Sequence, residues 1–258
     1  DLTRVLAGPT CARTLAEHGA DVLKINGPHL PSIGYQEYDT SHGKLAAYLD
    51  LREPSDLGTL KTLLSTGDVF SQGYRPGTLA KRGLAPETLA ALRPGIVCVS
   101  LSAFGHVGPW ADRRGFDTVI QSVSGIADRQ GAIFPGPRSG PKFYPVSAID
   151  YLTGNLMAFG ALVALARRAT EGGSWLVRIS LAQVGHWLIT RGQLPPEALT
   201  EVPAEFEPEE LERWRVTSET PMGRLRHLGP VVELPETPPR WERPSVPLGS
   251  HAPEWPAR

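Results

Sequence analysis

The sequence contains few cysteines, almost no net charge and no long hydrophobic run. Cys11 and Cys98 stand far apart, which excludes a disulfide framework and a thiolate metal site. With 26 Lys+Arg against 27 Asp+Glu, the formal charge of -1 gives no reason to expect nucleic acid or an anionic membrane as partner. The longest apolar run, Leu156 to Ala166, is shorter than the roughly 20 residues that a bilayer span needs, and it predicts a buried core helix.

Several short motifs are also missing from the sequence. It has no Gly-x-Gly-x-x-Gly and no phosphate-loop pattern, so no nicotinamide, flavin or ATP site is predicted. No group of His, Cys, Asp and Glu has the spacing of metal ligands, and no metal site is predicted. No secretory signal is visible, and we expect a cytoplasmic protein.

Short apolar strands alternate with helical patterns over residues 1–190. The expected strands are Asp1 to Leu6, Val22 to Ile25, Asp68 to Gln72, Ile96 to Leu101 and Trp175 to Leu181. The expected helices are Cys11 to His18, Asp56 to Ser65, Pro86 to Leu92, Asp117 to Ile126 and Ala148 to Arg168. This alternation predicts an α/β fold, with a mostly parallel, Rossmann-like sheet and helices on both faces.

The pattern changes in residues 191–258. Thirteen of the 25 prolines lie between residues 192 and 258, and seven glutamates lie between Glu197 and Glu212. Such a composition does not sustain long helices or central strands. We expect an irregular tail that packs on the main domain or on a partner, with a strand or hairpin within Leu225 to Leu234.

Asp150 is the most informative single residue, because it opens the long apolar helical pattern that begins at Ala148. Asp is a preferred residue at helix N-termini, so one interpretation is a capping carboxylate. The alternative is a reactive anion at the edge of a low-dielectric interior, stabilised by the helix dipole.

The ordered motifs of this chain resemble those of the class III CoA-transferase family, which includes formyl-CoA:oxalate and carnitine CoA-transferases and the related α-methylacyl-CoA racemases. The resemblance covers residues 1–190 and a short tail near Arg240 to Leu248. It is carried by Asp1-Leu2-Thr3-Arg4-Val5-Leu6-Ala7-Gly8-Pro9, Leu49-Asp50-Leu51-Arg52, Gly73-Tyr74-Arg75-Pro76-Gly77, Ser100-Leu101-Ser102-Ala103-Phe104-Gly105 and Arg113-Arg114-Gly115-Phe116-Asp117.

The resemblance implies a covalent reaction with Asp150 as the nucleophile. In the family a carboxylate attacks an acyl-CoA thioester, forms a mixed anhydride and then an enzyme-bound CoA thioester, and passes CoA to an acceptor acid. No prosthetic group is implied, since coenzyme A enters as the acyl-CoA substrate. The implied partners are acyl-CoA, a carboxylic acid and a second protein chain.

The same resemblance assigns a set of coenzyme A contacts, which combine backbone segments with cations suited to phosphate oxygens. These residues are Leu6, Ala7, Leu49, Asp50, Leu51, Arg52, Gly73, Tyr74, Arg75, Lys81, Arg114 and Phe116. Racemase activity is disfavoured, because Phe116 stands where racemases have a histidine and cannot transfer a proton.

The sequence departs from the family pattern after Trp187, where the insert that builds the smaller domain is largely absent. One hypothesis is a partial transferase that works as a homodimer or as the second half of a longer tandem polypeptide. The other is a degenerate subunit that only binds coenzyme A or mediates dimerisation. A third hypothesis is a plain α/β interaction module with no activity, for which we expect Asp150 to cap its helix while the cations Arg52, Lys81 and Arg114 point to separate surfaces. For the transferase we expect these cations and Asp150 to line one cleft.

Overall fold

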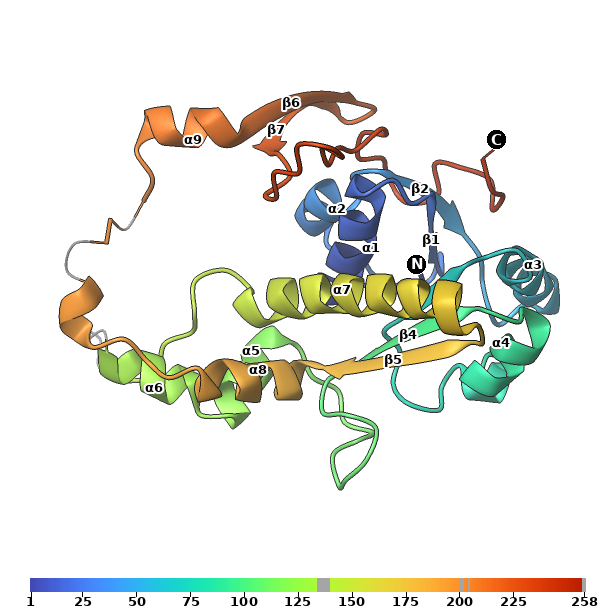
Figure 1. Cartoon of the computed structure of the whole chain (residues 1–258), viewed down its shortest axis with the longest axis horizontal. Helices are drawn as coiled ribbons and strands as arrows, with labels where there is room; N and C mark the ends of the chain where they lie inside the picture. Colours follow the sequence, from blue (N-terminus) through green and yellow to red (C-terminus); the bar gives the residue numbers. More distant parts are fainter. Residues whose placement is uncertain (134–139, 200–201, 204, 257–258) are drawn as a thin grey trace.

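A parallel sheet lies at the centre of the computed structural model, which describes residues 1–133, 140–199, 202–203 and 205–256 (Figure 1). Two parallel ladders form it, one with two strands and one with three. The strands are β1 (Val22–Asn26), β2 (Lys44–Tyr48), β3 (Val69–Gln72), β4 (Val97–Ser102) and β5 (Trp175–Ser180).

The segment Asp1–Leu2 joins the two ladders. The amide of Ile25 in β1 donates to the carbonyl oxygen of Asp1 (2.9 Å), and the amide of Leu2 donates to the carbonyl oxygen of Ser71 in β3 (2.7 Å). The strand positions therefore follow the order β2, β1, Asp1–Leu2, β3, β4, β5. The predicted strand Asp1 to Leu6 is wrong in extent, because Leu2 forms one isolated bridge and the left-handed backbone of Val5 ends the extended run.

Helices cover both faces of the sheet, as the sequence predicts. The helices of this part are α1 (Ala7–Glu17), α2 (Gly34–Thr40), α3 (Pro54–Leu64), α4 (Pro86–Leu92), α5 (Asp117–Val123), α6 (Ile126–Ile133), α7 (Ala148–Glu171) and α8 (Leu181–Thr190). Leucines of α3 and α4 pack with Phe70 and Cys98 on one face. On the other face, α1 and α7 pack on Val97 and Val99.

The longest helix, α7, is long and apolar enough to cross a membrane by length and composition. In this fold it lies along α1 and above β4 and β5 (Figure 1). Met157 and Ala161 are fully buried there, while Phe159 and Leu162 on the outer side are exposed. Packing of one side against the sheet and α1 accounts for the apolar run that the sequence assigns to a core helix.

The tail carries a short helix and a hairpin, namely α9 (Pro208–Trp214), β6 (Arg215–Thr220) and β7 (Gly223–Leu228). The hairpin lies earlier in the chain than the predicted stretch, because its turn falls before Gly223 rather than after Leu225. Beyond it, the tail returns to the main body, where Trp241 Nε1 donates to the Arg13 carbonyl oxygen (3.2 Å) and the His251 amide donates to that of Ala46 (2.8 Å). The division of the chain at residues 190 and 191 stays a prediction.

Candidate functional site

The order of the strands defines where a ligand site is expected. From Asp1–Leu2 the chain adds β1 and β2 on one side, and it then crosses to add β3, β4 and β5 on the other. In open parallel sheets, ligands bind at the carboxyl ends of the strands where this direction reverses. Here the reversal falls between Leu2 and β3. A Cβ at Gly73 would lie 3.8 Å from Thr3 Cβ, so the two loops that leave this point are in contact.

Two strained valines mark the same edge of the sheet. Val5 (φ 70°) and Val146 (φ 56°) are the non-glycine residues with positive φ in the described ranges. A β-branched residue in this region is a genuine outlier, and such strain gathers at functional sites. Val5 shortly precedes α1 and Val146 shortly precedes α7, so both distortions set how a helix begins.

The first turns of α1 and α7 are in close contact. A Cβ at Gly154 would lie 2.5 Å from the carbonyl oxygen of Ala7 and 2.6 Å from Thr10 Cβ. Only a glycine allows this approach, since real Cβ atoms essentially never come within 3.0 Å of a neighbouring atom. The contact brings the predicted coenzyme A residues Leu6 and Ala7 to within about one helical turn of Asp150 along α7.

The Asp150 carboxylate does not cap α7. The capping function belongs to Asp117 of α5, whose Oδ2 accepts hydrogen bonds from the amides of Ile149 (2.8 Å) and Asp150 (3.1 Å). Gln121 holds Asp117 in place, because its Nε2 donates to Asp117 Oδ1 (2.5 Å) while its Oε1 accepts from the Tyr144 amide (2.8 Å). The described residues provide no hydrogen bond or ion pair to the carboxylate of Asp150.

Burial changes the acidity of Asp150, whose residue exposure is 5%. Desolvation, with a further contribution from the negative charge of Asp117, raises its pKa from 3.8 to about 7. Such a carboxyl group exchanges its proton near neutral pH. A perturbed pKa of this kind, at the strand edge where ligands bind, is typical of a functional group.

The predicted contacts at the ends of β2 and β3 meet in one region. Leu49 and Phe70 share an apolar cluster on which Leu51 and Tyr74 pack. Arg82 Nη1 donates to the Leu51 carbonyl oxygen (2.5 Å), which joins the segment 49–52 to the short helix that carries Lys81. Sequence segments far apart along the chain are therefore neighbours, and they lie on the carboxyl side of the sheet.

One cavity of about 270 Å³ lies beside this region. Its lining includes the predicted residue Arg75 and two basic residues that the sequence analysis missed, His106 and Arg178. Ser100 Oγ lies 3.1 Å from His106 Nε2, so the loop after β4 is tied to the sheet. Arg178 follows strand alternation on the exposed side of β5, but nothing in its local sequence distinguishes it from a solvated charge.

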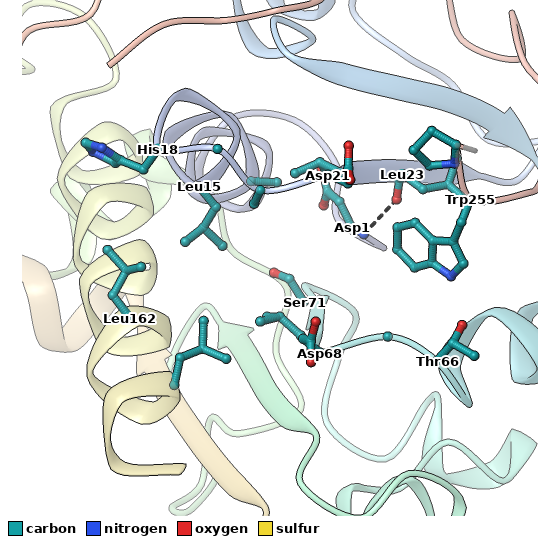
Figure 2. Close-up of a pocket in the computed structure, with 18 of the residues that line it drawn as sticks. Asp1, Leu15, His18, Asp21, Leu23, Thr66, Asp68, Ser71, Leu162 and Trp255 are labelled. Atoms are coloured by element: carbon teal, nitrogen blue, oxygen red, sulfur yellow. Dashed lines mark hydrogen bonds between the residues drawn. The ribbon is translucent and has the colours of Figure 1, made fainter. Parts of the chain in front are cut away.

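Other predicted residues stay apart. Two cavities in the described part of the chain, of about 270 and 910 Å³ (the larger in Figure 2), are lined neither by Asp150 nor by the cations Arg52, Lys81 and Arg114. Arg52 is exposed and forms a fork with Asp50 (Nε to Oδ1, 2.9 Å), which holds the pKa of Asp50 well below its ordinary value. The expectation that these cations and Asp150 share one cleft is not met by these cavities.

Asp117 and Gln121 are the functional neighbours that the sequence analysis did not identify. The sequence predicts Asp117 at the start of a helix, where an acidic residue in the first turn is stabilised by the dipole of its own helix, α5. Nothing in the local sequence indicates that it caps α7. Phe116 lies just before it and is exposed. Among the described residues no group of three or more His, Cys, Asp and Glu could hold a metal ion.

The chain is similar in sequence to known CoA-transferases. The sequence model of CoA-transferase family III matches residues 1–211. Succinyl-CoA--D-citramalate CoA-transferase of Chloroflexus aurantiacus is 32% identical over 78% of this chain and 52% of its own length. Formyl-CoA:oxalate CoA-transferase of Rhodopseudomonas palustris is 31% identical over 75% of this chain and 47% of its own length. The chain spans about half the length of such relatives.

Solved structures show the same fold. The protein Rv3272 of Mycobacterium tuberculosis superposes with a TM-score of 0.69 at 27% identity, over 74% of this chain and 55% of that one. A CAIB/BAIF family protein of Brucella suis gives a TM-score of 0.66 at 25% identity, over 86% of this chain and 62% of that one. The mixed α/β architecture with a parallel sheet is therefore shared with these proteins.

Proposed function

Because the chain belongs to CoA-transferase family III, we propose that it transfers coenzyme A between an acyl-CoA thioester and a carboxylic acid, with Asp150 as the acyl acceptor. One observation carries the assignment of Asp150. Its carboxylate is free of the capping function, since Asp117 accepts the hydrogen bonds of the first α7 amides. The carboxylate therefore remains available for attack at the end of the helix that points toward the carboxyl edge of the sheet.

The proposed reaction starts when an Asp150 oxygen attacks the thioester carbonyl carbon. The C–S bond breaks, CoA leaves as the thiolate, and a mixed anhydride forms on Asp150. The thiolate then attacks the aspartyl carbonyl carbon and releases the donor acid, which leaves an aspartyl-CoA thioester. The acceptor carboxylate forms a second anhydride in the same way, and thiolate attack on its acyl carbon regenerates Asp150.

The environment of Asp150 suits both reactivity and protection. A pKa of about 7 leaves the group ionised in mildly alkaline solution, where a poorly solvated carboxylate is a stronger nucleophile than one in bulk water. The anhydride is sensitive to hydrolysis, and a side chain with little contact with solvent limits that loss.

Coenzyme A would lie across the point where the direction of strand addition reverses, from the first turn of α1 to the ends of β2 and β3. The residues proposed to contact it are Leu6, Ala7, Leu49, Asp50, Leu51, Arg52, Gly73, Tyr74, Arg75, Lys81, Arg114 and Phe116. The contact between α1 and α7, the shared cluster under Leu49 and Tyr74, and the cationic cavity at Arg75 support this path. Racemisation stays disfavoured, because Phe116 cannot carry a proton.

A second candidate is a subunit that binds coenzyme A or dimerises without catalysis. It is favoured by the small exposure of Asp150 and by the separation of Arg52, Lys81 and Arg114 from the two cavities. A relative of Chloroflexus aurantiacus is a beta subunit of a succinyl-CoA--L-malate CoA-transferase. We propose that this chain also works with a second chain, as a homodimer or as half of a tandem polypeptide, and in the cytoplasm.

A transfer assay separates the two candidates. A panel of CoA esters is incubated with a panel of carboxylic acids and the full chain, and new CoA esters are detected by mass spectrometry. We expect transfer by the unchanged protein and a loss on the order of 10³-fold in Asp150→Asn. Asp128→Asn, which changes an exposed carboxylate on α6, is the matched control. Binding of CoA esters without turnover by both proteins would favour the non-catalytic subunit.

A further inference from the structure

The first turn of α7 is attached to helices on both of its sides. Figure 1 shows α5 and α2 on opposite sides of α7. Asp117 of α5 accepts from the amides of Ile149 and Asp150 (2.8 and 3.1 Å). The hydroxyl group of Tyr151 donates to Asp39 Oδ2 of α2 (3.0 Å). Neither Tyr151 nor Asp39 belongs to the proposed coenzyme A contacts, so the second attachment has no function assigned so far.

Arg13 of α1 fixes the position of Asp39. Its Nη1 donates to Asp39 Oδ1 (2.6 Å) and to the Asp39 carbonyl oxygen (3.3 Å). The two oxygens of the carboxylate are thus shared between a guanidinium group of α1 and a phenol of α7. Hydrogen bonds to an ionised partner are stronger than neutral ones. Helices α1, α2 and α7 are therefore joined by one network of side chains, which consists of Arg13, Asp39 and Tyr151.

Trp241 of the tail packs against the same arginine. Its Nε1 donates to the Arg13 carbonyl oxygen (3.2 Å), and the guanidinium carbon of Arg13 lies 5.8 Å from the centre of the Trp241 ring. The same carbon lies 6.0 Å from the centre of the Tyr151 ring. At these distances a cation and an aromatic ring attract each other. The tail therefore restricts the movement of Arg13.

The hydrogen bond from Tyr151 persists over the pH range in which Asp150 titrates. Burial, together with the charge of Asp39 and the hydrogen bond to it, raises the pKa of Tyr151 to about 12. The phenol is therefore still a donor at the pH where Asp150, with a pKa of about 7, releases its proton.

We propose that Arg13, Asp39 and Tyr151 are positioning residues, which hold the first turn of α7 so that the Asp150 carboxylate meets the thioester carbonyl carbon in the geometry for attack. This inference rests on the function proposed for Asp150. Since no described residue bonds to that carboxylate, its direction depends on the backbone that carries it. A misplacement of about 1 Å can lower a reaction rate about a hundredfold. Attachments on opposite sides prevent a rotation of the helix start that a single attachment would allow.

Steady-state kinetics tests the proposal. Tyr151→Phe removes only the hydroxyl group, and Asp39→Ala removes the acceptor for both Arg13 and Tyr151. Each variant should lower kcat for coenzyme A transfer about tenfold or more. KM for the CoA ester should stay within about twofold, because the lost contacts orient Asp150 and do not bind the ester. Tyr35→Phe, at an exposed tyrosine of the same helix as Asp39, is the matched control and should keep both constants.

A double variant separates a connected network from independent structural effects. Because the Tyr151 hydroxyl group acts through Asp39, adding Tyr151→Phe to Asp39→Ala should lower kcat by less than about twofold further. Trp241→Leu should lower kcat by a smaller factor than Asp39→Ala, since it leaves the carboxylate and the phenol in place. Urea unfolding confirms that each variant is folded in the assay. If Asp39→Ala does not fold, Asp39→Asn takes its place, because Asn keeps only one acceptor oxygen.

The outcomes distinguish this inference from the proposed function. An unchanged kcat in Tyr151→Phe, with transfer abolished in Asp150→Asn, would overturn the positioning network and leave Asp150 as the nucleophile. A raised KM with an unchanged kcat would assign the network to substrate binding and would also overturn the inference. Transfer that persists in Asp150→Asn would remove the nucleophile and the positioning network together.

Discussion

Replacing Asp150 by Asn should stabilise the protein, and should do so more strongly as the pH rises. The folded state raises the pKa of Asp150 from 3.8 to about 7, so ionising the buried group opposes folding. One unit of pKa is equivalent to about 1.4 kcal/mol, so the difference amounts to about 4 kcal/mol. The unchanged protein loses this free energy of unfolding as the pH rises from 3.8 to 7, because the unfolded chain releases the proton first.

The amide in Asp150→Asn does not ionise, so the variant escapes this loss. Burying an amide without a partner costs about 1–3 kcal/mol at every pH, which lowers the net gain but not its pH dependence. The free energy of unfolding of Asp150→Asn minus that of the unchanged protein should therefore increase by about 4 kcal/mol from pH 4 to pH 8. If Asp150 were a capping carboxylate, the pH dependence of the free energy of unfolding would have the opposite sign. Asn caps a helix about as well as Asp, but it lacks the negative charge that the helix N-terminus stabilises, so the variant would lose stability relative to the unchanged protein as the pH rises.

Urea unfolding at pH 4, 6 and 8 measures the effect, with the slope m checked for constancy. Asp128→Asn provides the control for the loss of a carboxylate, because Asp128 is exposed. A decrease in stability of Asp150→Asn that grows with pH would refute the reasoning. It would mean that the Asp150 anion is stabilised by partners in the folded state.

Three further predictions follow from the site. Asp117→Asn removes the negative charge beside Asp150, so the pKa of Asp150 should fall. The rise of kcat/KM with pH, expected near pH 7, should therefore move to lower pH, and an unchanged midpoint would contradict this. Gly154→Ala should lower the free energy of unfolding by about 2–3 kcal/mol through the clash with Ala7, whereas Gly58→Ala in the open part of α3 should raise it by about 0.5–1 kcal/mol. Arg178→Gln should weaken CoA binding about tenfold or more in calorimetry, with Arg129→Gln as the control; equal affinities would remove Arg178 from the site.

The strands and helices with strong apolar patterns could be predicted from the sequence, and others could not. Strand β2 was missed because Lys44 begins it, and a lysine rarely lies in a core strand. In the structure Lys44 is fully buried and bonds to the Pro9 carbonyl oxygen (2.8 Å) and to Asp1 Oδ2 (2.9 Å). Lys24 is buried beside Glu37 in the same way. Such pairs are formed by tertiary contacts, and hydropathy along the chain does not reveal them.

The candidate site shows the same limit. Its nucleophile could be proposed from the apolar helix behind Asp150 and from the resemblance, but two interpretations remained because capping depends on distant residues. Asp117 settles the capping question through a contact between α5 and α7. The left-handed backbone of Val146 is likewise imposed by the fold, since valine does not favour it locally.

Hydroxylamine trapping shows directly whether Asp150 carries an acyl group during the reaction. The full chain is incubated with acyl-CoA and hydroxylamine, digested, and searched by mass spectrometry for a hydroxamate on the peptide that contains Asp150. We expect the hydroxamate at Asp150 in the unchanged protein and in Asp128→Asn, and none in Asp150→Asn. Turnover of CoA esters with no modification at Asp150, or with the hydroxamate on another carboxylate, would contradict it.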